Sequence, residues 1–182
     1  MKYVLQGIET ERLKFRLLEE RDFDTWVPLF ETTDAPRFLG LDLKLTPEEM
    51  CQFWFDKVFN RYSNDLGGLS VLMDKKTGKF IGQCGLLVQS IEGKEYLEVG
   101  YSILPDFWGK GYASEAAVKC KNEGFRRSFS EELISTVHVD NIGSATVAQR
   151  NGMKIFKSIK DYEGMPVNIF MITKAEWEKS DL

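Results

Sequence analysis

Residues 109–114 read Gly-Lys-Gly-Tyr-Ala-Ser and lead into an alanine-rich stretch that is typical of a helix. A glycine-bearing turn that runs into a helix start exposes several backbone N–H groups, and the helix dipole adds partial positive charge there. Such a turn binds phosphate. We call residues 109–114 the glycine loop and predict that it holds the phosphates of a ligand. Lys110 either adds a positive charge or is simply a solvated lysine.

Three kinds of phosphate-binding loop contain such glycines, and the neighbouring residues separate them. A Walker loop requires Gly-Lys-Ser/Thr, whereas Gly109 and Lys110 are followed by Gly111. A Rossmann turn requires an early βαβ unit and an acidic residue about 20 positions on, whereas about half of this chain precedes the loop. The third kind is the acyl-CoA loop, Gln/Arg-x-x-Gly-x-Gly/Ala. The run from Trp108 to Ala113 resembles it in all but the first position, and is similar to the RimJ/RimL branch of the GNAT N-acetyltransferases.

Two further stretches resemble the same family. Residues 10–13 resemble its Thr-Glu-Arg-Leu opening, and Asn141, Ser144 and Gly152 resemble its second signature, with Met153 in place of the usual Phe. The resemblance covers nearly the whole chain. It implies an α+β fold in which a mixed, mostly antiparallel sheet splays at the strand before the glycine loop and is flanked by helices. It also implies acetyl-CoA as co-substrate, no metal, and an amine as acceptor.

The resemblance further implies which residues hold the cofactor. Backbone groups of the strand before the loop would bind the pantetheine arm and the thioester oxygen, and the loop amides would hold the pyrophosphate. Asn141 would reach the amide linkage of the cofactor, a role compatible with that of a helix N-cap. The candidate cofactor-binding residues are Tyr101, Ser102, Ile103, Trp108, Gly109, Lys110, Gly111, Tyr112, Ala113, Ser114 and Asn141.

Attack of an amine on a thioester requires a base for the amine proton and a proton for the leaving thiolate. Glu98 is the candidate base, directly or through a water, and its alternative is a solvent-exposed charge on a strand edge. His138 is the other candidate base, although a lone histidine on a strand is more often structural. Ser144 is the candidate near the sulfur, or simply a first-turn helix residue. The Tyr that usually serves as acid in the family corresponds to Ala148 here.

Hydrophobic periodicity predicts the elements that position these residues. Strands are expected at 13–18, 69–73, 79–89, up to about 104, 133–139, 155–162 and 167–173. Helices are expected at 19–31 with a kink or break at Pro28, and at 46–62, 111–125, 141–151 and 174–180, with 33–45 irregular. The strand at 133–139 should lie parallel to the one before the glycine loop. Gly82 and Gly85 predict bulges or a close approach of backbones.

The helix at 46–62 begins with Thr46, which we expect to cap it together with Glu49. Its aromatic stripe predicts a buried face, and some of these rings would border the acceptor cleft at its open edge. The residues of this predicted face are Met50, Phe53, Trp54, Val58 and Phe59.

Chain length, net charge, apolar runs and cysteine content restrict the class of protein. The 182 residues predict one domain, 1–182, and the net charge of −4 argues against a nucleic-acid binder. The chain shows no signal peptide and no apolar run of the roughly 20 residues that a membrane span requires. The three cysteines, Cys51, Cys84 and Cys120, have no ligand-like spacing and predict reduced thiols in a cytoplasmic protein.

The sequence therefore predicts a cytoplasmic N-acetyltransferase that moves an acetyl group from acetyl-CoA to an amine. The acceptor is either a protein N-terminus, as on ribosomal proteins, or a small amine. The alternative is a non-catalytic acyl-CoA sensor or interaction module on the same fold, which the alanine at position 148 mildly favours. A nucleotide-binding domain would instead bind ATP or NAD more tightly than coenzyme A. The resemblance leaves a homodimer open.

Overall fold

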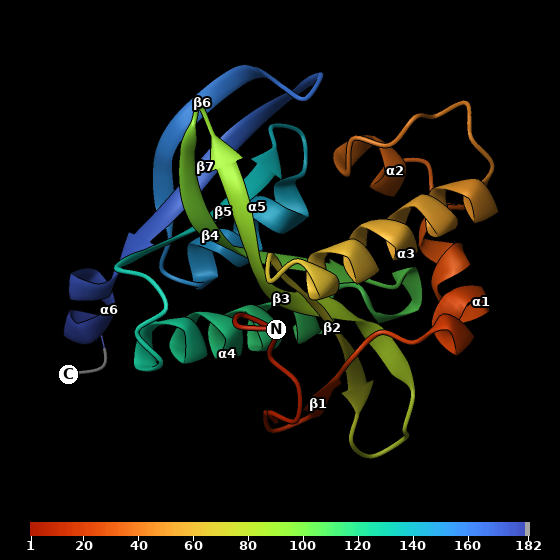
Figure 1. The fold of residues 1–182 in the computed structure, drawn as a ribbon, viewed down its shortest axis with the longest axis horizontal. Coiled ribbons are helices and arrows are strands. Elements are labelled where there is room, and N and C mark those ends of the chain that lie inside the picture. Colours follow the sequence, from red (N-terminus) through yellow and green to blue (C-terminus); the bar gives the residue numbers. More distant parts are fainter. Residues whose placement is uncertain (181–182) are drawn as a thin grey trace.

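The computed structural model describes residues 1–180. Within them, seven strands form one sheet in the order β1-β2-β3-β4-β5-β7-β6 (Figure 1). The strands are β1 (Leu13–Arg16), β2 (Gly67–Asp74), β3 (Phe80–Ile91), β4 (Lys94–Ile103), β5 (Glu132–His138), β6 (Lys154–Tyr162) and β7 (Met165–Thr173). The helices are α1 (Phe23–Trp26), α2 (Ala35–Phe38), α3 (Pro47–Ser63), α4 (Tyr112–Arg126), α5 (Ile142–Arg150) and α6 (Lys174–Ser180). The expected α+β fold with a mixed, mostly antiparallel sheet is confirmed.

Strands β2, β3 and β4 form the predicted antiparallel meander. The register shifts between Leu72 and Met73, which is the bulge that glycine within β3 suggested. A Cβ on Gly82 would lie 2.4 Å from the Ser102 carbonyl oxygen, and a Cβ on Gly85 would lie 2.2 Å from the Gly68 carbonyl oxygen. Both glycines therefore allow neighbouring backbones to approach closely, as predicted.

The parallel pair of the sheet, β4 and β5, separates soon after it forms. Within the described residues the two strands pair at two positions, Leu97 with Leu133 and Glu98 with Ile134. Strand β5 then continues along β7, while β4 continues along β3 as far as Ile103. The edge of β4 that faces β5 thus has no strand partner beyond Glu98 in the described chain. The predicted splay before the glycine loop is present.

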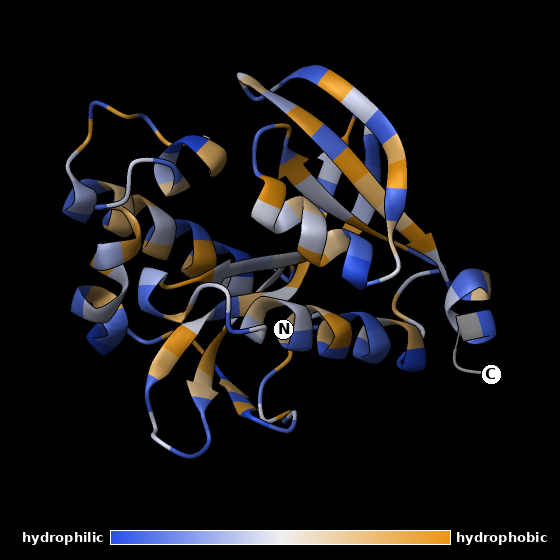
Figure 2. Cartoon of the chain, turned by 180° about the vertical axis from the view of Figure 1, so that it is seen from behind, coloured by the Kyte–Doolittle hydropathy of each residue, from blue (hydrophilic) through white to orange (hydrophobic). Residues whose placement is uncertain are grey.

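Different helices cover the two faces of the sheet, because successive side chains of a strand point to opposite faces. On β2, Val71 belongs to the buried cluster that contains Phe55 and Val58 of α3. The next residue, Leu72, belongs to the cluster that contains Ala117 of α4. Figure 2 shows hydrophobic residues along the strands between these helices, and a mixture of hydrophobic and hydrophilic residues along the β6–β7 hairpin at the sheet edge.

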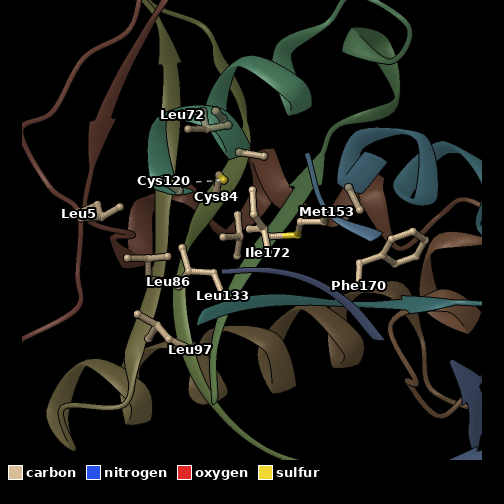
Figure 3. Close-up of a cluster of buried hydrophobic side chains, with 14 of the residues drawn as sticks. Leu5, Leu72, Cys84, Leu86, Leu97, Cys120, Leu133, Met153, Phe170 and Ile172 are labelled. Atoms are coloured by element: carbon tan, nitrogen blue, oxygen red, sulfur yellow. Dashed lines mark hydrogen bonds between the residues drawn. The ribbon is translucent and has the colours of Figure 1, made fainter. Parts of the chain in front are cut away.

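Helix α4 sits close to the sheet because its inner face is small. Ala116, Ala117 and Cys120 are fully buried. The Sγ atoms of Cys84 and Cys120 lie 3.4 Å apart in the centre of this cluster (Figure 3). All three cysteines of the chain are buried and none forms a disulfide.

Two predicted segments differ from the structure. The helix expected over 19–31 is divided into short turns, 20–22 and 27–29 of 3-10 geometry on either side of α1. The expected break at Pro28 is present: α1 ends at Trp26, and Pro28 lies in the first turn of the segment 27–29, where its missing N–H costs nothing. The segment 33–45 was expected to be irregular but contains α2, with Pro36 in its first turn rather than acting as a breaker.

The capping box of α3 is confirmed: Thr46 accepts a hydrogen bond from the Glu49 amide, and Glu49 accepts one from the Thr46 amide. The predicted buried face of this helix was wrong at Phe53, whose side chain is 53% exposed. The buried residues are Met50, Cys51, Phe55 and Val58. Cys51, Phe55 and Val58 follow one another at intervals of four and three residues, which centres the buried stripe away from Phe53. Trp54 is partly buried and packs against the cluster that contains Val71 and Phe55.

The close contact at Gly85 predicts the first mutational outcome. Gly85→Ala would force its Cβ into the Gly68 carbonyl, and overpacking of this kind costs about 1–3 kcal/mol. The melting temperature should fall by several degrees in a thermal unfolding experiment.

Gly143→Ala is the matched control. Its nearest neighbour would be 3.7 Å away, and alanine is the better helix former, so the melting temperature should stay or rise slightly. An unchanged melting temperature for Gly85→Ala would mean that β2 and β3 approach less closely than described.

Candidate active site

A cleft of about 650 Å³ opens where β4 and β5 diverge. Its walls come from the glycine loop, β4, β5, α5, α2, α3 and the turn between β6 and β7. Every predicted cofactor-binding residue except Lys110 lines it, and so do Glu98, Ser144 and His138. The cleft extends from the glycine loop past the splay to α3. We call the part lined by the glycine loop and β4 the cofactor half, after the predicted ligand, and the part lined by α2, α3 and the β6–β7 turn the acceptor half.

The glycine loop presents free backbone donors. Gly109 and Gly111 have φ of 71° and 82°, in the left-handed region, and Gly111 is the N-cap of α4 without offering a side chain. Among the residues that the structure describes, none accepts a hydrogen bond from the amides of residues 109–114. These amides and the helix start fit the phosphate-binding role that the sequence predicted.

Two residues of the predicted cofactor site bind the local backbone. The Trp108 indole N–H donates to the Ile103 carbonyl oxygen at 2.6 Å. The Lys110 ammonium donates to the Asp106 carbonyl oxygen at 2.7 Å. Both side chains therefore hold the segment between β4 and α4 in shape, and a direct contact with a cofactor stays a prediction for each.

Tyr101 and Ser144 come together across the cleft, from β4 and α5. The Tyr101 hydroxyl donates to the Ser144 carbonyl oxygen at 2.8 Å and accepts from the Ser144 hydroxyl at 3.2 Å. Burial raises the pKa of Tyr101 above its ordinary value. The Asn141 side chain accepts from the Ser144 amide at 3.0 Å, so the predicted N-cap of α5 is confirmed. Ala148, at the usual acid position of the family, is fully buried.

Glu98 lies at the floor of the splay and is 6% exposed, so the solvent-exposed alternative for it was wrong. Its Oε1 accepts from the Thr136 amide at 3.0 Å. Its Oε2 and the Thr136 hydroxyl are buried and have no hydrogen-bond partner in the described chain. Burial raises the pKa of Glu98, and the hydrogen bond from the Thr136 amide and the charge of Arg61 oppose that rise. A buried carboxylate with one free oxygen and a raised pKa is suited to accept a proton.

His138 is buried where β5 ends. Its Nδ1 accepts a hydrogen bond from the Asp140 amide at 3.1 Å. The imidazole lies 5.1 Å from the Phe38 ring of α2, measured between centroids. These contacts tie the β5–α5 turn and α2 together across the cleft, which is the structural role that a lone histidine usually has.

The wall of the cleft opposite the glycine loop was predicted only in part: Trp54 of α3 lines it as expected, whereas its polar residues were not foreseen. Arg61 of α3 donates to the carbonyl oxygens of Leu66 and Val88 and to the Gln89 side chain. Phe38 of α2 and Lys57 of α3 line the same half. These residues belong to no short motif, and only the pairing of distant strands brings them to Glu98.

Within residues 1–180, no group of three or more His, Cys, Asp or Glu side chains is placed to hold a metal ion. In the same residues, no helix is both long and apolar enough to span a membrane.

Comparison with known proteins assigns this cleft to a family. Residues 12–154 match the family described as an acetyltransferase (GNAT) domain. The chain belongs to the GNAT acetyltransferase family. The predicted family membership is thus confirmed, and the chain is an acetyl-CoA-dependent acyltransferase by class. YkkB of Bacillus subtilis, described as an uncharacterized protein, is 32% identical over 165 residues, which cover 88% of this chain and 92% of YkkB.

Solved structures of two acetyltransferases share the fold. RimL, described as a ribosomal L7/L12 alpha-N-protein acetyltransferase and solved with coenzyme A, has a TM-score of 0.70, 17% identity and coverage of 92% of this chain and 97% of RimL. A spermidine N-acetyltransferase from Vibrio cholerae, solved with CoA and spermine, has a TM-score of 0.71, 16% identity and coverage of 92% and 98%. The two are named for different acceptors, so the GNAT fold alone does not fix the acceptor.

A substitution in the glycine loop tests cofactor binding. Gly111→Val places a branched side chain in a left-handed conformation, which costs roughly 1–2 kcal/mol, and covers the amides of the loop. Affinity for coenzyme A, measured by calorimetry, should fall roughly tenfold or more, or about 1.4 kcal/mol.

Gly93→Val provides a control with the same strain. Gly93 has φ of 81° and open space around it, in the turn between β3 and β4. It should lose similar stability and keep its affinity for coenzyme A. A folded Gly111→Val variant with normal affinity would move the pyrophosphate away from the glycine loop.

Proposed function

We propose that this protein is an acetyl-CoA-dependent N-acetyltransferase that acetylates the α-amine of a peptide or protein N-terminus, with Glu98 as general base. The observation that carries the proposal is the position of Glu98. Its buried, unpartnered Oε2 lies where β4 and β5 part, between a glycine loop with free amides and a second half of the cleft. A base there can reach an amine that approaches a thioester laid along β4.

The cofactor half of the cleft offers the backbone donors that an acyl-CoA would bind. The free amides of residues 109–114 would bind the pyrophosphate, and the unpaired edge of β4 at Tyr101, Ser102 and Ile103 would bind the pantetheine arm and the thioester oxygen. Asn141 uses its Oδ1 to cap α5, and its Nδ2 makes no hydrogen bond to another described residue. That amide group is therefore left to bind the cofactor's own amide linkage.

Ser144 is the proposed proton donor to the thiolate. In the structure the Ser144 hydroxyl donates to Tyr101, so it would have to rotate toward the sulfur to protonate the thiolate. The Tyr101 hydroxyl, which donates to the Ser144 carbonyl oxygen, would keep the residue in position. Tyr101 itself is a weak acid because burial raises its pKa. This pair offers hydroxyl groups near α5, where the family's usual tyrosine is replaced by Ala148.

The acceptor half favours an α-amine over a polyamine. An α-amine has a pKa of about 8 and needs less help to lose its proton than an alkyl amine with a pKa of about 10.4. Lys57 and Arg61 line this half together with the carboxylates of Asp34, Glu98 and Glu163, so the preference rests on the pKa of the amine and not on the charge of the walls. A small primary amine remains the alternative acceptor.

The proposed unit is the whole chain, residues 1–182, in the cytoplasm. The family match ends at residue 154, but Tyr162, Met165 and Val167 beyond it line the cleft. The free, buried cysteines agree with a reducing compartment.

The direct test of the proposal is release of coenzyme A thiol from acetyl-CoA over a panel of acceptors, with a no-acceptor control. Peptides with a free N-terminus should give more thiol than the same peptides blocked by N-terminal acetylation, and more than spermidine. Acetyl-CoA binding without thiol release for any acceptor would support the non-catalytic sensor instead.

Glu98→Gln tests the base in the same assay. The change keeps the shape of the side chain and removes its basicity, and should lower kcat by about 10²–10⁴. In the unmodified protein, kcat should fall as pH drops through the raised pKa of Glu98, because only the carboxylate accepts a proton. In the variant the midpoint of the acidic limb should move from the pKa of Glu98 to that of the amine, so that kcat climbs with pH as free amine accumulates.

Glu95→Gln, at an exposed position on the same strand, is the matched control and should keep kcat. If Glu98→Gln keeps a normal kcat at neutral pH while His138→Gln loses it, the base is His138 and the assignment of Glu98 is wrong.

A further inference from the structure

The residues just before β1 reach the glycine loop, although about 100 positions separate them in the chain. Residues 10–12 lie against the first turn of α4 through the carboxylate of Glu115. Glu115 accepts from the Thr10 hydroxyl, from the Arg12 amide at 2.9 Å and from Arg12 Nε at 2.6 Å. We infer that Arg12 binds the pyrophosphate of the acyl-CoA beside the glycine loop, an inference that rests on the proposed function and adds a cofactor-binding residue to it.

The Arg12 guanidinium is held in one orientation by three contacts. Besides the Nε bond to Glu115, Nη1 donates to the Lys110 carbonyl oxygen at 2.9 Å. The guanidinium carbon lies 4.3 Å from the centroid of the Tyr112 ring. Lys110 and Tyr112 are both glycine-loop residues, so Arg12 moves with the loop as one unit.

The remaining nitrogen of the guanidinium is available to a ligand. Arg12 Nη2 donates to no other residue in the described part of the chain. It lies 3.5 Å from the position that a Cβ on Gly111 would occupy. Arg12 does not itself line the cleft, but Nη2 lies beside Gly111, which does, so its two N–H groups are next to the loop that the pyrophosphate would contact. Arginine offers such donors in a fixed fork that suits phosphate oxygens.

Charge supplies the second reason. Burial favours a neutral Glu115, but hydrogen bonds from Thr10 and Arg12 hold its pKa below the ordinary value, so this carboxylate is ionised near neutral pH. An ionised carboxylate in the first turn of α4 stabilises the helix but repels a nearby pyrophosphate. Arg12 neutralises it at 2.6 Å and still presents Nη2 to the ligand.

The fold does not depend on Arg12. Its side chain is 39% exposed, and ion pairs at such positions contribute roughly 0–1 kcal/mol to stability. Arg12→Met should therefore fold, and the effect on cofactor binding can be measured apart from stability.

The experiment is calorimetric titration of coenzyme A into the full chain at low and high ionic strength, for Arg12→Met and Arg12→Lys. Arg21→Met is the control, because Arg21 is 73% exposed and pairs with Glu19 away from the cleft.

Arg12→Met should weaken binding roughly 10- to 100-fold at low salt, as expected for the loss of a charged hydrogen bond. Its affinity should also depend less on salt than that of the unmodified protein. Arg12→Lys keeps the charge and should keep the salt dependence, and Arg21→Met should change neither quantity.

Normal affinity in folded Arg12→Met would overturn the inference. So would a loss of affinity with unchanged salt dependence, because the arginine would then act only on the shape of the loop. These outcomes differ from failure of the proposed function, in which the unmodified protein itself would not bind coenzyme A.

Discussion

The structure depends on one parallel pair of strands, β4 and β5, whose pairing ends after two positions. After Leu97 and Glu98, β4 and β5 no longer share ladder hydrogen bonds, and buried backbone groups without partners are costly. Two side chains bridge the opening in their place. The Ser135 hydroxyl donates to the Val99 carbonyl oxygen at 2.8 Å, and the Thr136 amide donates to Glu98 at 3.0 Å. The opening is thus a stabilised feature of the fold, which leaves the rest of the β4 edge for a ligand.

This constraint gives Glu98 its chemistry. One oxygen completes the bridge between the strands, and the other is left buried and unpartnered. The same residue therefore holds the cleft open and faces into it. Burial raises its pKa, while Arg61, fixed by carbonyl oxygens of the α3–β2 turn and β3, limits that rise. The proposed proton acceptor is thus positioned by the sheet rather than by a loop.

Short sequence motifs predicted the structural features that depend on residues close together in the chain. The glycine loop, the capping box at Thr46, the Asn141 cap and the parallel direction of β5 follow from short motifs and from the order of elements. The Tyr101–Ser144 contact and the Arg12–Glu115 pair could not be predicted in this way, because each joins residues 43 or 103 positions apart. The sequence predicted most residues that line the cleft beside the glycine loop. Of the opposite wall, which is assembled from α2, α3 and the β6–β7 turn, it predicted only α3.

The central claim is that the parting of β4 and β5 is the acyl-CoA site. Hydrogen exchange of the full chain, with and without acetyl-CoA, measures it most directly, because free backbone amides gain protection when a ligand binds them. The account predicts protection in two segments, the β4 edge at residues 99–103 and the glycine loop at 109–114, with less at the β4 edge when ATP replaces acetyl-CoA. Protection by acetyl-CoA that spares both segments, or equal protection of both by ATP, would contradict it.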